Sequence, residues 1–160
     1  DGEAIATSNL ALAQWELGDH ESGEQGFHSA IEQFTPLGRP REQGFSHLGL
    51  ALVYQVRGEL EAASTQLQEA IGLFHRHGDL LAEALATCLR AVVWFEQGEQ
   101  NRALAILNGV LEESELLSDA LVRALRSALR VLEDSGVPDL AESHYERVVA
   151  AALSAFLTRT

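Results

Sequence analysis

Three arginines in the C-terminal part of the chain have the type and spacing needed to bind carboxylate groups. Arg123, Arg126 and Arg130 are three and four residues apart, so their side chains lie on one face of a helix. A guanidinium group binds a carboxylate through paired N–H donors. The spacing therefore predicts a stripe that meets acidic groups of a partner, unless the arginines pair with acidic neighbours such as Glu133.

Residue types that serve in metal binding and catalysis occur without the spacing those functions need. His75 and His77 are two residues apart at an expected helix end, so they point to different sides, and the remaining histidines lack a ligand partner at metal spacing. No phosphate-binding loop and no Ser/His/acid set is recognisable. Cys88 has no motif around it and is expected to be a small buried or groove-lining thiol. We therefore expect no metal, no cofactor and no enzymatic activity.

A glycine followed by a short polar turn recurs along the chain at intervals of 40, 40 and 38 residues. These glycines are Gly18, Gly58, Gly98 and Gly136. Residues at fixed offsets from them also recur, with small residues five positions later and mostly large apolar residues nine positions later. Self-similarity at a fixed period of this length predicts a repeat protein.

Helix-forming residues fill these repeats, and apolar positions recur at intervals of three and four rather than two. We predict eight helices in four antiparallel hairpins, at 3–17 and 20–35, 41–57 and 59–77, 79–97 and 99–114, and 118–135 and 138–158. The repeating glycines are placed at helix C-caps, where a left-handed residue ends the helix. The fold class is all-α, with no strand.

The turn Tyr54-x-x-x-Gly58-Glu59 and the step Ala63-x-x-x-Leu67 resemble the signature of the tetratricopeptide repeat family. The resemblance covers nearly the whole chain, although the period exceeds the usual 34 residues and the closing proline is missing from the second and third repeats. The resemblance implies that residues 1–160 form one domain. This domain is expected to be a right-handed superhelix of about four hairpins, with repeats at 3–36, 41–77, 79–115 and 118–158. The long period further resembles the repeat arms of MalT-type bacterial transcription activators.

Proteins of this family bind ligands along a concave groove lined by the first helix of each hairpin. If the core positions are four, seven and eight before each turn glycine, the groove positions are three, six and ten before it. The apolar residues at these positions, expected to be exposed in a row, are Leu12, Trp15, Leu48, Leu52, Val92 and Phe95. The fourth repeat contributes Arg123, Arg126 and Arg130.

A row of exposed apolar residues is unusual on a face that binds nothing. We therefore predict that the groove holds a peptide or amphipathic helix whose acidic groups meet the arginines. The alternative is that a tight superhelix partly buries the apolar residues. Because the chain has no lysine, we do not expect the Lys/Asn clamp with which some family members hold a C-terminal carboxylate.

The amino-acid composition limits the partners, the cellular compartment and the source organism that we expect for the protein. A net charge of −13 argues against binding to nucleic acids or anionic membranes, and no apolar run reaches the ~20 residues of a membrane span. A single cysteine fits a reducing, cytoplasmic compartment. The absence of Lys and Met suggests a GC-rich, bacterial genome, and without an initial Met the chain is expected to be a fragment of a longer protein.

The prediction is thus a non-catalytic scaffold for protein–protein interaction, an arm of a larger bacterial regulatory protein. One alternative is an effector-sensing arm of a transcriptional regulator that binds a small inducer, and another is a dimerisation or spacer module. The first helix begins with Ala4 and Ile5, and the stretch 148–157 is apolar on several sides. Since a solenoid needs polar outer faces at its ends, we expect further repeats there or a homodimer through the terminal helices.

Overall fold

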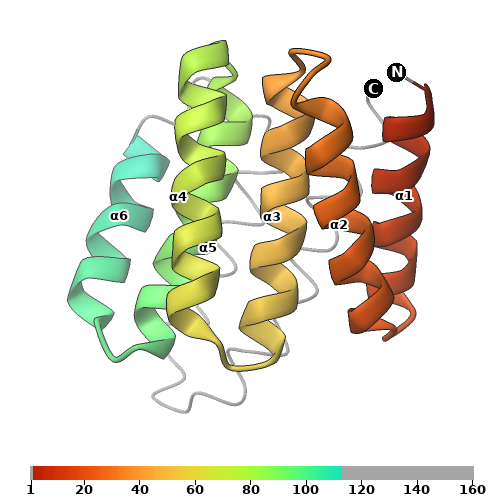
Figure 1. Ribbon diagram of the computed structural model, residues 1–160. Coiled ribbons are helices and arrows are strands. Elements are labelled where there is room, and N and C mark those ends of the chain that lie inside the picture. The colour runs from red at the N-terminus through yellow and green to blue at the C-terminus, as the bar shows by residue number, and fades with distance from the viewer. Residues whose placement is uncertain (1, 113–160) are drawn as a thin grey trace. The chain divides into compact units, whose positions relative to one another are not determined.

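The computed structural model describes residues 2–112, which form six α-helices joined by short turns (Figure 1). The helices are α1 (Gly2–Glu16), α2 (His20–Phe34), α3 (Pro40–Val56), α4 (Leu60–His77), α5 (Leu80–Glu96) and α6 (Gln100–Glu112). No strand occurs in this range, so the all-α class is confirmed. Within it, no helix has both the length and the apolar character needed to cross a membrane.

The predicted helix bounds agree closely with the structure. The first five helices begin and end within one residue of their predicted bounds, and α6 lies inside the predicted range 99–114. The predicted helices at 118–135 and 138–158 lie outside the described residues. The count of eight helices and the right-handed superhelix therefore stay predictions.

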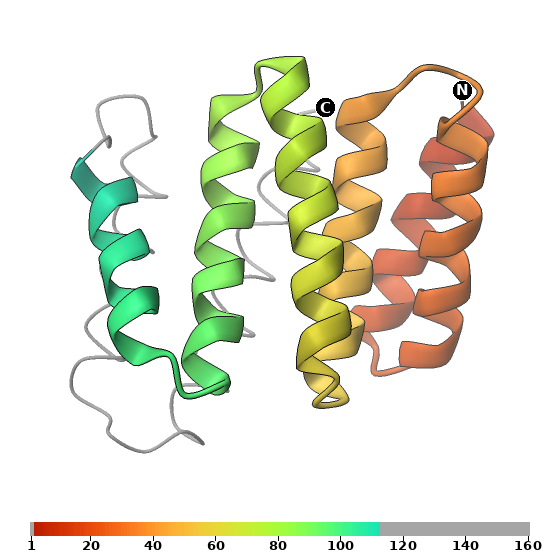
Figure 2. The same ribbon diagram turned by 60° about the vertical axis from the view of Figure 1, so that its left-hand side comes forward.

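The chain forms two compact units, and the boundary between Ala86 and Thr87 lies within α5. In the first unit, α1 packs on α2 and α3 packs on α4, so each pair is a helical hairpin. The hairpins stack because α2 packs on α3, and α1 also touches α3. Figures 1 and 2 show α1 to α4 as successive antiparallel helices that stand side by side.

The turn within each described hairpin has the same local chemistry. The first helix ends at a glycine with positive φ, and the residue after the glycine donates its N–H to the carbonyl four residues before the glycine. The glycines are Gly18 (φ 87°), Gly58 (φ 76°) and Gly98 (φ 87°). The bonds are Asp19 N–H to Gln14 O (2.9 Å), Glu59 N–H to Tyr54 O (2.9 Å) and Glu99 N–H to Trp94 O (2.8 Å). This arrangement is a Schellman motif, which needs a left-handed residue and so favours glycine.

Small residues at the repeating offsets let the helices approach closely. The residues seven before the glycine and five after it are buried in every described repeat: Ala11, Ala51 and Ala91, then Gly23, Ala63 and Ala103. An ideal Cβ atom on Gly26 would lie only 2.7 Å from the Cβ atom of Ala11. The two helices of the first hairpin are therefore in contact along their backbones, as the spacing predicts.

Large aromatic side chains of the second helices fill the space above glycines of α3. An ideal Cβ atom on Gly49 would lie 2.3 Å from the nearest ring atom of Phe27 in α2, and one on Gly44 would lie 2.7 Å from the ring of Phe74 in α4. Phe27 and Phe74 are both buried. The helix α3 thus receives one aromatic ring from each of its neighbours in the sequence.

Polar contacts also join the first hairpin to the second. Arg57, at the end of α3, forms an ion pair with Glu24 of α2, and the hydroxyl of Tyr54 lies 3.3 Å from Nε2 of His28. Burial, followed by the nearby Glu24 carboxylate, raises the pKa of Tyr54. The phenol is therefore neutral and can donate its proton in this interface.

Candidate functional site

The apolar residues predicted to line an exposed groove are buried. In the first unit these are Leu12, Trp15, Leu48 and Leu52, and in the second unit Val92 and Phe95; none exceeds 9% exposure. The expectation that they form an exposed row is therefore wrong. A ligand could contact them only if side chains around them moved.

The burial of α3 explains this error for Leu48 and Leu52. Its buried residues run from Gly44 to Val53 with only His47 half-buried, so they point in every direction around the helix. A helix that is apolar on all sides is an interior helix. The predicted groove positions were those left over once one core face had been assigned to each helix. This prediction assumed one buried face per helix, whereas α3 contacts α1, α2 and α4.

Trp15 lies against the other helix of its own hairpin. An ideal Cβ atom on Gly23 of α2 would be 3.3 Å from the Cβ atom of Trp15. The indole ring is also tilted against the ring of His20, with 6.2 Å between the ring centroids. Trp15 therefore packs between α1 and α2. The predicted arginine stripe of Arg123, Arg126 and Arg130 lies outside the described residues and stays a prediction.

The helix face that carries Leu48 and Leu52 ends at an accessible charged group. Phe45 and Arg41 lie three and seven residues before Leu48, and these spacings place them on the same face of α3. The Arg41 side chain is 24% exposed. Its guanidinium carbon lies 5.0 Å from the centroid of the Phe45 ring, a distance at which a cation is attracted to the ring face.

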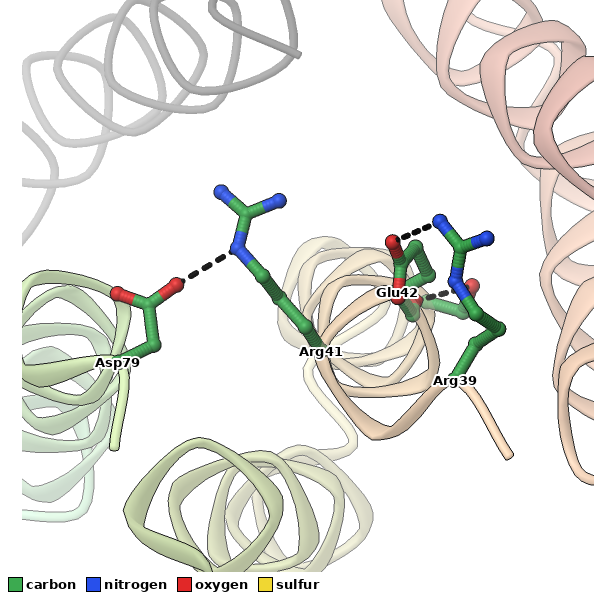
Figure 3. Close-up of polar contacts among 5 residues, drawn as sticks. Arg39, Arg41, Glu42 and Asp79 are labelled. Carbon is green, nitrogen blue, oxygen red and sulfur yellow. Dashed lines mark hydrogen bonds and ion pairs between the residues drawn. The ribbon is translucent and has the colours of Figure 1, made fainter. Parts of the chain in front are cut away.

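Arg41 is held by Asp79, which lies just before α5. The Nε–H group of Arg41 donates to Oδ2 of Asp79 at 2.7 Å (Figure 3). The other carboxylate oxygen, Oδ1, accepts the backbone N–H of Ala82 at 3.0 Å and so caps the first turn of α5. Each oxygen of Asp79 thus has a separate role. Figure 3 shows the two terminal nitrogens of Arg41 pointing away from Asp79.

A second ion pair lies beside this one. Arg39, the residue before α3, donates from its guanidinium group to the carboxylate of Glu42 in the first turn (Figure 3). The hydrogen bond from Arg39 lowers the pKa of Glu42, against a smaller effect of burial. Glu42 is therefore an anion at neutral pH and is already matched by Arg39.

Sequence analysis did not identify Arg41 and Asp79. Each residue could have been noticed by itself in the sequence. Arg41 lies seven residues before Leu48 on the same helix face, and Asp79 follows Gly78, the glycine that ends α4. Their pairing joins residues 38 positions apart. Only the stacking of elements in the fold brings them together.

The described residues hold little else that could do chemistry. Among residues 2–112, no group of three or more His, Cys, Asp or Glu side chains is placed to hold a metal ion. Cys88 is buried, and burial raises its pKa to about 12. The thiol is therefore protonated at neutral pH and is a poor nucleophile.

Comparison with known protein families identifies the repeat. The family model described as tetratricopeptide repeat matches residues 4–25 and 44–69. Each match covers a turn glycine, Gly18 or Gly58, together with parts of both helices of a hairpin. The chain is therefore similar to tetratricopeptide repeats over these two stretches, and the resemblance predicted from the turn motif is confirmed there. No curated protein matches the chain.

Proposed function

We propose that the chain is a non-catalytic interaction module that holds a peptide segment of another protein against the first helices of its hairpins. The observation that carries this proposal is the pair of stacked tetratricopeptide hairpins, because such repeats generally mediate protein–protein interaction. The apolar row on α1 and α3 is buried. We therefore place the first contact of the ligand at the accessible end of that row, at Arg41.

Peptide selection followed by hydrogen exchange tests this proposal. A displayed library of random peptides of about 16 residues, long enough for roughly four helical turns, is selected against the whole chain. We expect selected peptides to slow amide exchange most in α1 and in the first turns of α3. Failure to select any peptide, or protection confined to α2 and α4, would contradict the proposal.

We further propose that the module is an arm of a larger bacterial regulatory protein of the cytoplasm. The long repeat period, the absence of lysine and the single cysteine support this role. A DNA-binding or ATPase domain encoded in the same reading frame would support it. A flanking secretion or membrane signal would count against it.

The exposed face of α1 favours a second role, association through the N-terminal helix. Leu10 is 59% exposed and Leu17 is 86% exposed, whereas Leu50, the residue equivalent to Leu10 in the next repeat, is 1% exposed. The helix that carries Leu50, α3, packs on α1, α2 and α4, whereas α1 packs on α2 and, to a smaller extent, on α3. Leu10 and Leu17 therefore remain available for burial against another molecule.

We expect the whole chain to form dimers or larger species at high concentration, because water-exposed leucines favour burial. Light scattering coupled to size-exclusion chromatography measures the mass. The double variant Leu10→Asp/Leu17→Asp should be monomeric at the same concentration. A wild-type chain that is monomeric throughout, or a variant with unchanged mass, would contradict association through α1.

A further inference from the structure

The contact between Arg41 and Asp79 leaves part of the guanidinium group unused. An isolated arginine–carboxylate pair commonly forms two parallel hydrogen bonds. Here Asp79 accepts only the Nε–H bond of Arg41, because its other oxygen caps α5. Within residues 2–112, the terminal nitrogens of Arg41 have no hydrogen-bond acceptor. They form a planar pair of donors that can bind a carboxylate end-on.

The unused donors belong to a side chain that is already held in place. Asp79 fixes the guanidinium group from one side, and the Phe45 ring supports it at 5.0 Å. The Phe45 ring itself packs against Phe74, with 5.0 Å between the ring centroids. A long side chain that is held before binding loses less conformational entropy when the ligand arrives.

Charge distinguishes Arg41 from the neighbouring arginine. Glu42 forms its ion pair with Arg39 on the same helix end, and the charge of Arg41 makes only a smaller contribution to the lowered pKa of Glu42. The carboxylate of Asp79 accepts one bond from Arg41, from Nε–H, and the terminal nitrogens do not point toward Asp79 (Figure 3). A second carboxylate can therefore bind at the outer edge without displacing Asp79.

From this geometry we infer that Arg41 anchors an aspartate or glutamate side chain of the bound peptide through its two terminal nitrogens, an inference that rests on the proposed function. The ligand is then an acidic peptide whose carboxylate lies at the beginning of α3. The competing role for Arg41 is a purely structural link between α3 and Asp79. The two roles differ in one measurable quantity, the preference for an acidic residue over its amide.

The test compares two peptides on each protein variant. The peptide selected as above is made with each acidic residue in turn replaced by its amide, Glu→Gln or Asp→Asn. Affinities are measured by calorimetry for the whole wild-type chain and for three variants: Arg41→Met, Arg41→Lys and Arg76→Met. Lysine keeps the charge but lacks the planar pair of donors. Arg76, exposed near the end of α4, is the matched control for loss of one positive charge.

We expect one amide replacement to weaken binding to the wild-type chain by about tenfold, as for a charge-assisted hydrogen bond. The ratio of the dissociation constants of the amide peptide and the acidic peptide is thus about ten for the wild-type chain. This ratio should fall below about twofold for Arg41→Met, take an intermediate value for Arg41→Lys and be unchanged for Arg76→Met. Because each ratio compares two peptides on one protein, a general loss of stability cancels. Circular dichroism melting checks that each variant is folded.

The outcomes separate this inference from the proposed function. Peptides that bind α1 and α3 with no preference for an acidic residue would overturn the role of Arg41 and leave the interaction module standing. The same holds if the preference persists in both Arg41 variants. Failure of any peptide to bind this face would overturn both. If Arg41 only links α3 to Asp79, the Arg41 variants should melt at lower temperatures. The ratio of the dissociation constants of the amide and acidic peptides should then be the same as for the wild-type chain.

Discussion

Replacing Gly49 with alanine is expected to lower the free energy of unfolding by about 2 kcal/mol. Gly49 lies inside α3, where alanine by itself would be favoured over glycine by about 1 kcal/mol. However, the new Cβ atom would lie 2.3 to 2.6 Å from three ring atoms of the buried Phe27. Overpacking of this kind costs typically about 1 to 3 kcal/mol. This contact is so short that the steric cost should exceed the gain in helix propensity.

Gly72→Ala is the matched control for this experiment. Gly72 lies inside α4, and a Cβ atom added there would meet nothing within 4 Å. This variant should be more stable than the wild type by about 0.5 to 1 kcal/mol. Chemical denaturation followed by circular dichroism measures both variants. If both variants change the unfolding free energy in the same direction, the close contact of Phe27 with α3 is contradicted. Partial recovery of the unfolding free energy in the double variant Gly49→Ala/Phe27→Leu would support this contact.

Replacing Phe74 with alanine is expected to cost about 3 to 5 kcal/mol of unfolding free energy. The side chain is fully buried, fills the space above Gly44 and packs against the Phe45 ring at 5.0 Å. The variant loses the transfer energy of the ring and leaves a cavity between α3 and α4. Because Phe45 supports Arg41, the guanidinium group should also be less well fixed.

Leu37→Ala is the control for the loss of a large apolar side chain. Leu37 is 45% exposed, so its replacement should change the unfolding free energy by no more than about 0.5 kcal/mol. Thermal and urea denaturation give both values. A loss below about 1 kcal/mol for Phe74→Ala would show that Phe74 does not fill the interior of the second hairpin.

Local chemistry made the helices and turns predictable. A glycine that must adopt positive φ ends a helix wherever it stands, so Gly18 and Gly58 marked the turns without knowledge of the rest of the fold. Spacings of three and four residues identified the helices between them. The small residues at fixed offsets, such as Ala11 and Ala51, were likewise predictable because the repeated hairpin requires close helix contact at the same place each time.

Burial of the predicted groove was not predictable in this way. Leu10 and Leu50 occupy the same offset from their glycines, yet one is largely exposed and the other is buried. An offset describes the direction of a side chain within its own hairpin. It does not say how many other helices pack on that one, and α3 packs on three helices whereas α1 packs on two.

The amino-acid sequence alone thus determined the class of the protein, its helical hairpins and their glycine turns, because each depends on conformational preferences that act within a few residues. The tertiary structure decided which helix faces meet water and which charged groups meet each other. Arg41 and Asp79 are 38 residues apart and contact each other only because successive elements of the repeat stack. Their contact depends on packing between elements rather than on the order of residues within one.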